Sequence, residues 1–205
     1  MVERQLRRRG ISDERVLAAM EAVPREEFVP ERSRRRAYAD SALPIQEGQT
    51  ISQPWIVAAI CQALELKGEE LVLEVGTGSG YSAAILARLA REVLSVERHE
   101  SLALAAQATF ERLGVERVRV LVGDGSRGLS DQGPFQAIAV HATAPAPPGA
   151  LLRQLADGGR LVAPIAADDS TDLLTAFRRR GEQFESETIS PCRFVPLVGE
   201  EGFAG

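Results

Sequence analysis

The period of the hydrophobic positions changes part-way along the chain, and the first part is helical. Val16, Leu17, Met20 and Val23 follow helical spacing after the capping sequence at residues 12–14. Residues 55–66 are apolar almost all round, which predicts a helix buried on several sides. Between these helices, the composition predicts short helical or irregular structure at residues 26–36 and a loop at residues 43–54.

From residue 71 onward, short apolar runs alternate with amphipathic segments. Strands are predicted at residues 71–75, 92–96, 118–122, 135–140 and 160–164. Helices are predicted between them, at residues 82–89, 101–113 and 149–155. This alternation predicts an α/β fold with a doubly wound, parallel sheet. Residues 173–178 and 185–189, joined by a turn at Gly181, predict a terminal antiparallel hairpin.

We therefore expect a single domain over residues 1–205. Residues 1–66 would supply an N-terminal helical layer and a loop, and residues 67–205 would form the α/β core. Net charge is −5, so no global field draws the chain to nucleic acid. Short arginine clusters are interpreted as solvated faces, unless folding brings them together: residues 7–9, 34–36 and 178–180.

The location of the protein follows from what the sequence lacks. Residues 1–9 are charged and no apolar stretch follows them, which argues against a signal peptide. No window approaches the roughly 20 apolar residues that span a bilayer. Cys61 and Cys192 are too few for a disulfide framework and lie in apolar surroundings, so we expect buried free thiols. A cytoplasmic protein is predicted.

Three glycines follow the first core strand on alternate positions. Gly76, Gly78 and Gly80 stand between the strand and its helix, where glycine permits positive φ and a close approach of backbone N–H groups to a ligand. The dinucleotide fingerprint would need its third glycine one residue later, at Tyr81. With Glu74 inside the strand, the spacing is instead the pattern that holds S-adenosylmethionine. A tight turn without a ligand is the alternative.

The next strand ends carry further candidates, because ligands of open α/β sheets bind at the carboxyl ends of the strands. Glu97 lies 21 residues after Gly76, the offset at which an acid accepts hydrogen bonds from ribose hydroxyls. Asp124 could form an Asx turn or accept a bond from an adenine amino group, and Glu97 favours the ligand role. His141 could be a general base, or a histidine without a chemical role.

The loop before the second long helix resembles a family signature. Residues 43–45, Leu-Pro-Ile, followed by residues 48–54, Gly-Gln-Thr-Ile-Ser-Gln-Pro, are similar to the protein-L-isoaspartate O-methyltransferases. Further similar blocks follow in family order, at residues 72–81, 123–125, 158–162 with Pro164, and 194–197. The loop and the glycine turn together are specific. Composition alone would make the loop a surface segment, with Ser52 as a helix N-cap.

The resemblance implies a mostly parallel, seven-stranded, Rossmann-like methyltransferase sheet whose final strand order departs from the common arrangement. It implies proteins or peptides with L-isoaspartyl residues as substrate. Methyl transfer from S-adenosylmethionine to the free α-carboxylate gives an ester and S-adenosylhomocysteine. The ester then closes to a succinimide, and hydrolysis returns some normal aspartate.

The resemblance also implies roles for individual residues. The serine matching Ser52 is catalytic and would orient the carboxylate, and residues 194–197 would run beside the substrate peptide. A carboxylate with a pKa near 3.9 is already ionised, so no general base is needed and His141 receives no essential role. We expect a monomer with no metal and no nucleic-acid or membrane partner. The expected cofactor contacts are Gln49, Thr50, Ile51, Gly76, Thr77, Gly78, Ser79, Gly80, Glu97, Arg98, Asp124 and Gly125.

Four positions depart from the family pattern and keep other functions open. Gln46 and Glu47 stand where the family usually has glycine after Leu-Pro-Ile, and Glu47 would repel a carboxylate unless it points outward. Gln136 replaces an aspartate, and His141 replaces a threonine. One alternative is methylation of another nucleophile, such as a small-molecule hydroxyl or amine, with His141 as base. A non-catalytic cofactor-binding module is the other.

Overall fold

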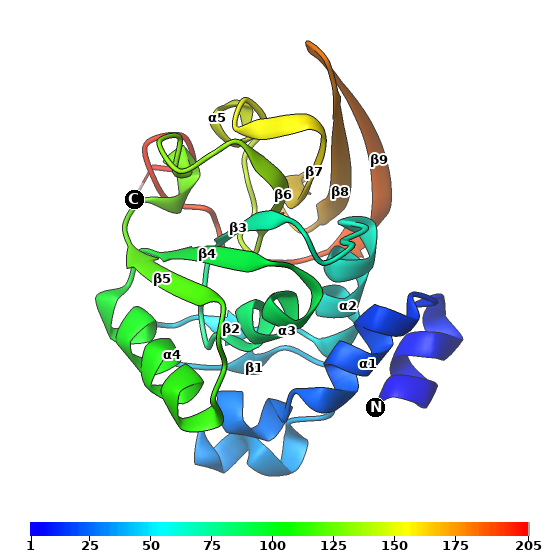
Figure 1. Cartoon of the computed structure of the whole chain (residues 1–205). Coiled ribbons are helices and arrows are strands. Elements are labelled where there is room, and N and C mark those ends of the chain that lie inside the picture. Colours follow the sequence, from blue (N-terminus) through cyan, green and yellow to red (C-terminus); the bar gives the residue numbers. More distant parts are fainter. Residues whose placement is uncertain (205) are drawn as a thin grey trace.

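A computed structural model describes residues 1–204 of the chain. Within these residues, seven strands form one sheet in the order β5-β4-β3-β6-β7-β8-β9 (Figure 1). The five strands from β5 to β7 are parallel, whereas β8 and β9 are antiparallel to their neighbours. The strands are β3 (Leu71–Val75), β4 (Glu92–Glu97), β5 (Val118–Val122), β6 (Phe135–Val140), β7 (Leu155–Ala166), β8 (Asp172–Arg180) and β9 (Gln183–Cys192). The predicted mostly parallel sheet and terminal hairpin are confirmed.

The helices agree with the predictions except at two ends. The predicted helix at 149–155 is wrong at its end, because Leu155 is fully buried in β7, paired with Phe135. The long apolar helix, predicted at residues 55–66, ends earlier, at Ala63, and Glu65 just beyond it adopts a left-handed φ of 49°. The helices are α1 (Glu14–Ala22), α2 (Pro54–Ala63), α3 (Tyr81–Leu89), α4 (Glu100–Leu113) and α5 (Gly149–Leu152).

Shorter elements lie between the long helices and strands, and residues 26–36 form short helical turns, one of the two structures predicted for them. The expected loop at 43–54 contains a small antiparallel pair of strands. The pair is β1 (Leu43–Pro44) and β2 (Thr50–Ile51), and the helical turns are η1 (Val2–Leu6), η2 (Arg7–Arg9), η3 (Arg25–Phe28), η4 (Glu31–Arg36) and η5 (Gly125–Arg127).

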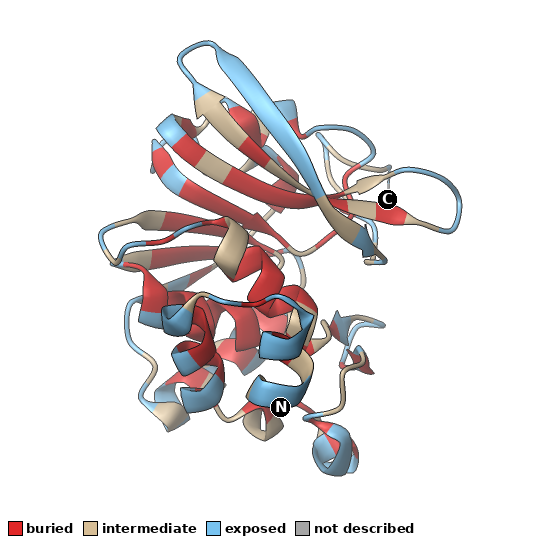
Figure 2. Cartoon of the chain, turned by 90° about the vertical axis from the view of Figure 1, so that its right-hand side faces the viewer, coloured by how far each residue is buried: buried red, intermediate tan, exposed pale blue. Residues whose placement is uncertain are grey.

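Alternate side chains of each central strand point to opposite faces of the sheet, and each face has its own hydrophobic cluster. Val72 and Val93 belong to the cluster that α1, α2, α3 and α4 cover. Leu73 and Leu94, one residue further along, belong to the cluster that includes α5 and Leu197. Figure 2 shows the buried residues concentrated in the sheet and in the helices packed on it. The N-terminal helices therefore share a hydrophobic cluster with the sheet.

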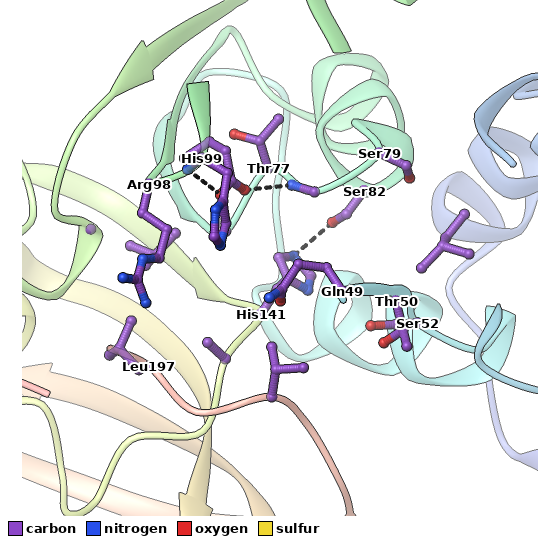
Figure 3. Close-up of a pocket in the computed structure, with 18 of the residues that line it drawn as sticks. Gln49, Thr50, Ser52, Thr77, Ser79, Ser82, Arg98, His99, His141 and Leu197 are labelled. Carbon is purple, nitrogen blue, oxygen red and sulfur yellow. Dashed lines mark hydrogen bonds between the residues drawn. The ribbon is translucent and has the colours of Figure 1, made fainter. Parts of the chain in front are cut away.

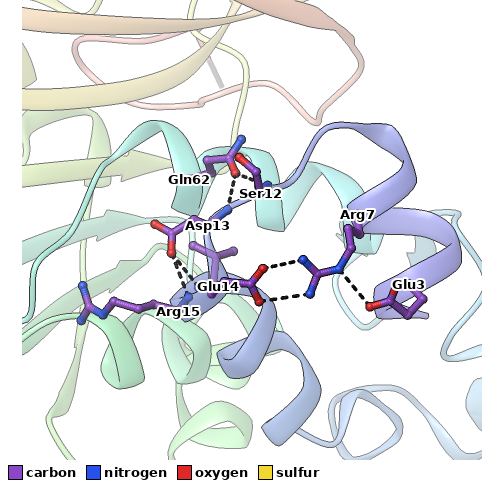
Figure 4. A network of polar contacts seen from close by, with 8 residues as sticks. Glu3, Arg7, Ser12, Asp13, Glu14, Arg15 and Gln62 are labelled. Atoms are coloured by element: carbon purple, nitrogen blue, oxygen red, sulfur yellow. Dashed lines mark hydrogen bonds and ion pairs between the residues drawn. The ribbon is translucent and has the colours of Figure 1, made fainter.

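Polar contacts attach the N-terminal layer to α2 (Figure 4). Asp13 caps α1, accepting hydrogen bonds from the backbone N–H groups of Arg15 at 2.8 Å and Val16 at 3.3 Å. Gln62 in α2 accepts from the backbone N–H groups of Ser12 at 2.7 Å and Asp13 at 3.0 Å. The predicted cap at residues 12–14 is confirmed, and it also fixes the position of α1 against α2.

The strand register aligns the carboxyl ends of three central strands. Val75 at the end of β3 pairs with Val96 in β4 and with Val140 in β6. The chain order reverses at β3, which is where open α/β sheets form their ligand crevice. Beyond these ends the C-terminal segment crosses, with the Leu197 N–H donating to the Thr143 carbonyl at 2.8 Å. The segment closes one side of the crevice.

Two expectations about the environment of the chain can be compared with the structure. Cys61 is a buried free thiol, as predicted, and burial raises its pKa. Cys192 is free but only partly buried, because it lies at the end of the edge strand β9. None of the helices in residues 1–204 has the length and apolar character needed to cross a bilayer.

Replacing Gly80 with alanine should destabilise the fold by about 2–4 kcal/mol, because left-handed strain adds to overpacking. Gly80 has a φ of +87°, and a Cβ there would lie 2.7 Å from the Phe110 ring. Gly10 has a φ of +91° with no atom within 4 Å of its added Cβ, so Gly10→Ala should cost only about 1–2 kcal/mol. Chemical denaturation measures the free energy of unfolding of both variants. Equal losses of unfolding free energy in the two variants would contradict the steric argument.

Candidate active site

A cavity of about 300 Å³ lies at the carboxyl ends of the central strands. In Figure 3, Arg98 and His99 lie toward one side of the cavity, Thr50 and Ser52 toward the other, and His141 between them. Most of the predicted site residues line it: Gln49, Thr50, Ile51, Ser52, Gly76, Thr77, Gly78, Ser79, Glu97, Arg98 and Gly125. The fold thus brings the loop of the family signature to the glycine turn.

Glu97 connects the glycine turn to the neighbouring strand. One carboxylate oxygen accepts a hydrogen bond from the Gly78 N–H at 2.9 Å, and the other accepts from the His99 N–H at 3.0 Å. Gly76 and Gly78 adopt φ values of 92° and 53°, as the alternate glycines predicted. Each carboxylate oxygen can accept a further bond, so Glu97 remains available to a pair of ribose hydroxyls.

Gly80 has a packing role in the structure, and its expected contact with the cofactor stays a prediction. It does not line the cavity, and its missing side chain makes room for the Phe110 ring of α4. Its N–H donates to the Thr77 carbonyl at 2.8 Å, which closes the turn just before α3. The spacing of the glycines alone does not tell whether a missing side chain makes room for a ligand or for a neighbouring helix.

Asp124 also lies outside the cavity lining, next to Gly125, which lines it. One carboxylate oxygen accepts from the N–H and hydroxyl of Ser126 at 2.9 Å and 2.7 Å, and the other accepts from the Glu200 N–H at 2.8 Å. Burial opposes ionisation, yet these donated bonds lower the pKa of Asp124 below its ordinary value. Asp124 forms the Asx-type turn that was the alternative interpretation, and it holds the C-terminal turn. An adenine contact stays a prediction.

Ser52 is not the N-cap of the helix that follows it. Helix α2 begins at Pro54, with Gln53 at the N-cap position and no side-chain capping bond. The Ser52 carbonyl accepts a hydrogen bond from Arg25 Nη2 at 2.6 Å. The Ser52 hydroxyl makes no hydrogen bond within residues 1–204, and Ser52 lines the cavity. Sequence reasoning missed Arg25, which belongs to a segment distant in sequence.

Two departures from the family pattern have structural explanations. Glu47 accepts a hydrogen bond from the Ser101 hydroxyl at 2.6 Å, and its other carboxylate oxygen lies 3.9 Å from His99 Nδ1. The charge therefore faces the N-terminal turn of α4, where a helix favours an anion. Gln136 accepts from the Leu71 N–H at 2.8 Å, at the start of β3 and away from the cavity.

His141 is held between two polar side chains. Its Nε2 lies 2.8 Å from the Ser82 hydroxyl and 3.3 Å from Oε1 of the fully buried Glu74. The other Glu74 oxygen accepts from the Ser95 hydroxyl at 2.5 Å. Because Nε2 already faces two partners, this nitrogen is poorly placed to remove a proton from an acceptor. No group of three or more His, Cys, Asp or Glu side chains in residues 1–204 is arranged to hold a metal.

Comparison with known proteins identifies the family. The family model described as "Protein-L-isoaspartate(D-aspartate) O-methyltransferase (PCMT)" matches residues 1–202. The chain belongs to this family. Proteins named protein-L-isoaspartate O-methyltransferase in Koribacter versatilis and, as number 2, in Marinobacter nauticus are 48% and 52% identical to it. These matches cover 100% and 99% of this chain and 91% and 93% of the relatives.

Solved structures agree with the family assignment. One described as protein-L-isoaspartate O-methyltransferase has a TM-score of 0.87 at 30% identity, covering 98% of this chain and 67% of that chain. Another, from Plasmodium falciparum and in complex with S-adenosyl-L-homocysteine, has a TM-score of 0.80 at 25% identity, covering 94% of each chain. The resemblance, the methyltransferase fold and S-adenosylmethionine as methyl donor are therefore confirmed.

Other lining residues were not predicted as contacts. Tyr81 and Ser82 begin α3, and Val57 belongs to α2. The position of Tyr81 and Ser82 gave a partial signal, because the first turn of a helix after a glycine turn faces the ligand crevice. Val198 extends the C-terminal wall one residue beyond the family block at 194–197.

Replacing Glu97 with glutamine should weaken S-adenosylhomocysteine binding about 10- to 100-fold, the range for a lost bond to a charged group. The amide would present one donor to the N–H groups that Glu97 now accepts from. Glu92→Gln, at the opposite end of the same strand, is the matched control and should leave the affinity unchanged. Calorimetry measures both; an unchanged affinity in Glu97→Gln would refute the cofactor assignment of this residue.

Proposed function

We propose that this chain transfers a methyl group to the free α-carboxylate of L-isoaspartyl residues in damaged proteins, with Ser52 orienting the acceptor. The observation that carries the proposal is the position of Ser52. Its hydroxyl, unpaired within residues 1–204, lies at the same cavity as Glu97, and Ser52 lies on the side opposite Arg98 and His99 (Figure 3). Family membership supports this choice of substrate.

The residues at the cavity fit S-adenosylmethionine. Glu97 offers acceptors for hydroxyl groups, and the turn at Gly76 and Gly78 brings backbone close to the ligand. Val96 and Leu197 supply apolar surface for a flat ring. When bound, S-adenosylmethionine supplies an electrophilic methyl group on a sulfonium sulfur.

The chain's own residues have to orient and shield the reacting oxygen. An α-carboxylate is ionised at neutral pH, so the site needs no general base. The Ser52 hydroxyl can donate a hydrogen bond to one carboxylate oxygen and leave the other directed along the cavity. The C-terminal wall, including Leu197, limits the access of water from one side. His141 keeps its contacts with Ser82 and Glu74, and the reaction requires no proton transfer from it.

We also propose that residues 1–205 act as one monomeric domain in the cytoplasm, without nucleic-acid or membrane partners. The hydrophobic cluster shared by the N-terminal helices and the sheet supports a single unit. The two free cysteines are compatible with a reducing compartment. Net charge of −5 disfavours attraction to nucleic acid.

Methyl transfer should occur with an L-isoaspartyl peptide and not with the aspartyl peptide of the same sequence. The two differ only in which carboxylate is free, so selectivity measures recognition of the α-carboxylate. Transfer of labelled methyl groups, with both peptides at matched concentrations, is the measurement. Equal transfer to both, or none to either, would refute the proposed substrate, and the second result would favour a binding module.

Ser52→Ala should lower kcat for the isoaspartyl peptide about 10- to 100-fold, the loss expected for a misplaced acceptor. Ser52→Thr keeps a hydroxyl and serves as the matched variant, with activity above that of Ser52→Ala. His141→Thr should still turn over, whereas a general-base role requires that it lose activity. Steady-state rates of methyl transfer decide between the two residues. If His141→Thr loses activity while Ser52→Ala retains it, the catalytic role belongs to His141 and not to Ser52.

A further inference from the structure

A buried arginine contacts the loop at residues 43–54 that carries Ser52. Arg25 is 0% exposed, and its Nε donates to the Ala37 carbonyl at 2.7 Å while Nη2 donates to the Ser52 carbonyl at 2.6 Å. The third nitrogen, Nη1, is buried without a hydrogen-bond partner in residues 1–204. The guanidinium carbon lies 4.6 Å from the centroid of the Tyr81 ring.

The positive charge of Arg25 has no carboxylate partner. None of the ion pairs in the described part of the chain includes Arg25; Asp40 attracts the charge from a distance but forms its ion pair with Arg9. Burial lowers the pKa of the Arg25 guanidinium, but arginine stays protonated in proteins. A buried cation without an anion is unfavourable. An anionic ligand in the neighbouring cavity would stabilise this charge.

Arg25 contacts two residues that line the cavity. Ser52 and Tyr81 both face it, and Arg25 touches the backbone of one and the ring of the other. These two residues therefore stand between the guanidinium and the part of the cavity where the substrate carboxylate would bind. Through a layer of protein of this kind, away from bulk water, the charge of Arg25 is felt more strongly than at the surface.

We propose that Arg25 is the positioning residue that selects an anionic acceptor: it fixes Ser52 through its carbonyl and supplies the positive charge behind it. The inference rests on the proposed function. Methylation forms an O–CH₃ bond as the S–CH₃ bond breaks, and the carboxylate becomes a neutral ester. The attraction to Arg25 therefore acts on the substrate and is lost in the product. Removing the charge should raise the KM for the peptide.

Three variants separate charge from structure. Arg25→Gln keeps an amide donor but removes the charge, and Arg25→Lys keeps the charge. Arg15→Gln is the matched control, because Arg15 also donates to two carbonyls, those of Leu66 and Leu89, away from the cavity (Figure 4 shows Arg15).

Arg25→Gln should raise the KM for the isoaspartyl peptide at least about tenfold, the scale of one charge interaction across a few ångströms of protein. The KM for S-adenosylmethionine should change little. Arg25→Lys should restore most of the peptide KM, and Arg15→Gln should lower only the unfolding temperature. An Arg25→Gln enzyme with unchanged peptide KM, or with both KM values raised equally, would overturn the proposal.

A binding measurement on the unaltered protein keeps the test independent of variant folding. In the complex with S-adenosylhomocysteine, the isoaspartyl peptide should have a lower dissociation constant than its α-carboxamide analogue. In Arg25→Gln the two dissociation constants should lie closer together. Equal binding of acid and amide overturns the role of Arg25. Failure of the unaltered enzyme to methylate any isoaspartyl peptide would instead overturn the proposed function.

Discussion

The site depends on the register of three parallel strands. Val75 pairs with both Val96 and Val140, so the strands on either side of β3 end level with it. Without that alignment the glycine turn, Glu97 and His141 would not face one cavity. Parallel pairing also requires the helical crossovers that cover the sheet, and their packing keeps the strand ends fixed. The chemistry therefore begins with backbone pairing rather than with a side chain.

The cofactor side and the acceptor side of the cavity come from different layers. Glu97 belongs to the sheet, whereas Ser52 lies in a loop of the N-terminal layer, whose position is fixed by contacts outside the sheet. Arg25 links that loop to the helical turns, and Gln62 of α2 holds the start of α1 within the same layer. A small displacement of this layer would move the acceptor relative to the methyl donor. The rate of methyl transfer is sensitive to this relative position.

Local sequence patterns predicted the sheet and the strand-end residues of the cavity, because strand period and strand ends are local properties. The loop residues 49–52 were predicted from the family resemblance instead. Local patterns were less informative where a role depends on a distant segment. Gly80 and Asp124 have the expected spacing, yet one packs against Phe110 and the other holds the C-terminal turn. Arg25 lies far from Ser52 in sequence, and no local pattern marks their contact. The direction of Glu47 likewise depends on α4.

A crystal structure of the enzyme with S-adenosylhomocysteine and an L-isoaspartyl peptide tests the central claim most directly. The account predicts the ribose at Glu97, the α-carboxylate within hydrogen-bond distance of the Ser52 hydroxyl, and a carboxylate oxygen facing the cofactor sulfur. A carboxylate bound away from Ser52, or a sulfur directed to another side of the cavity, would contradict it.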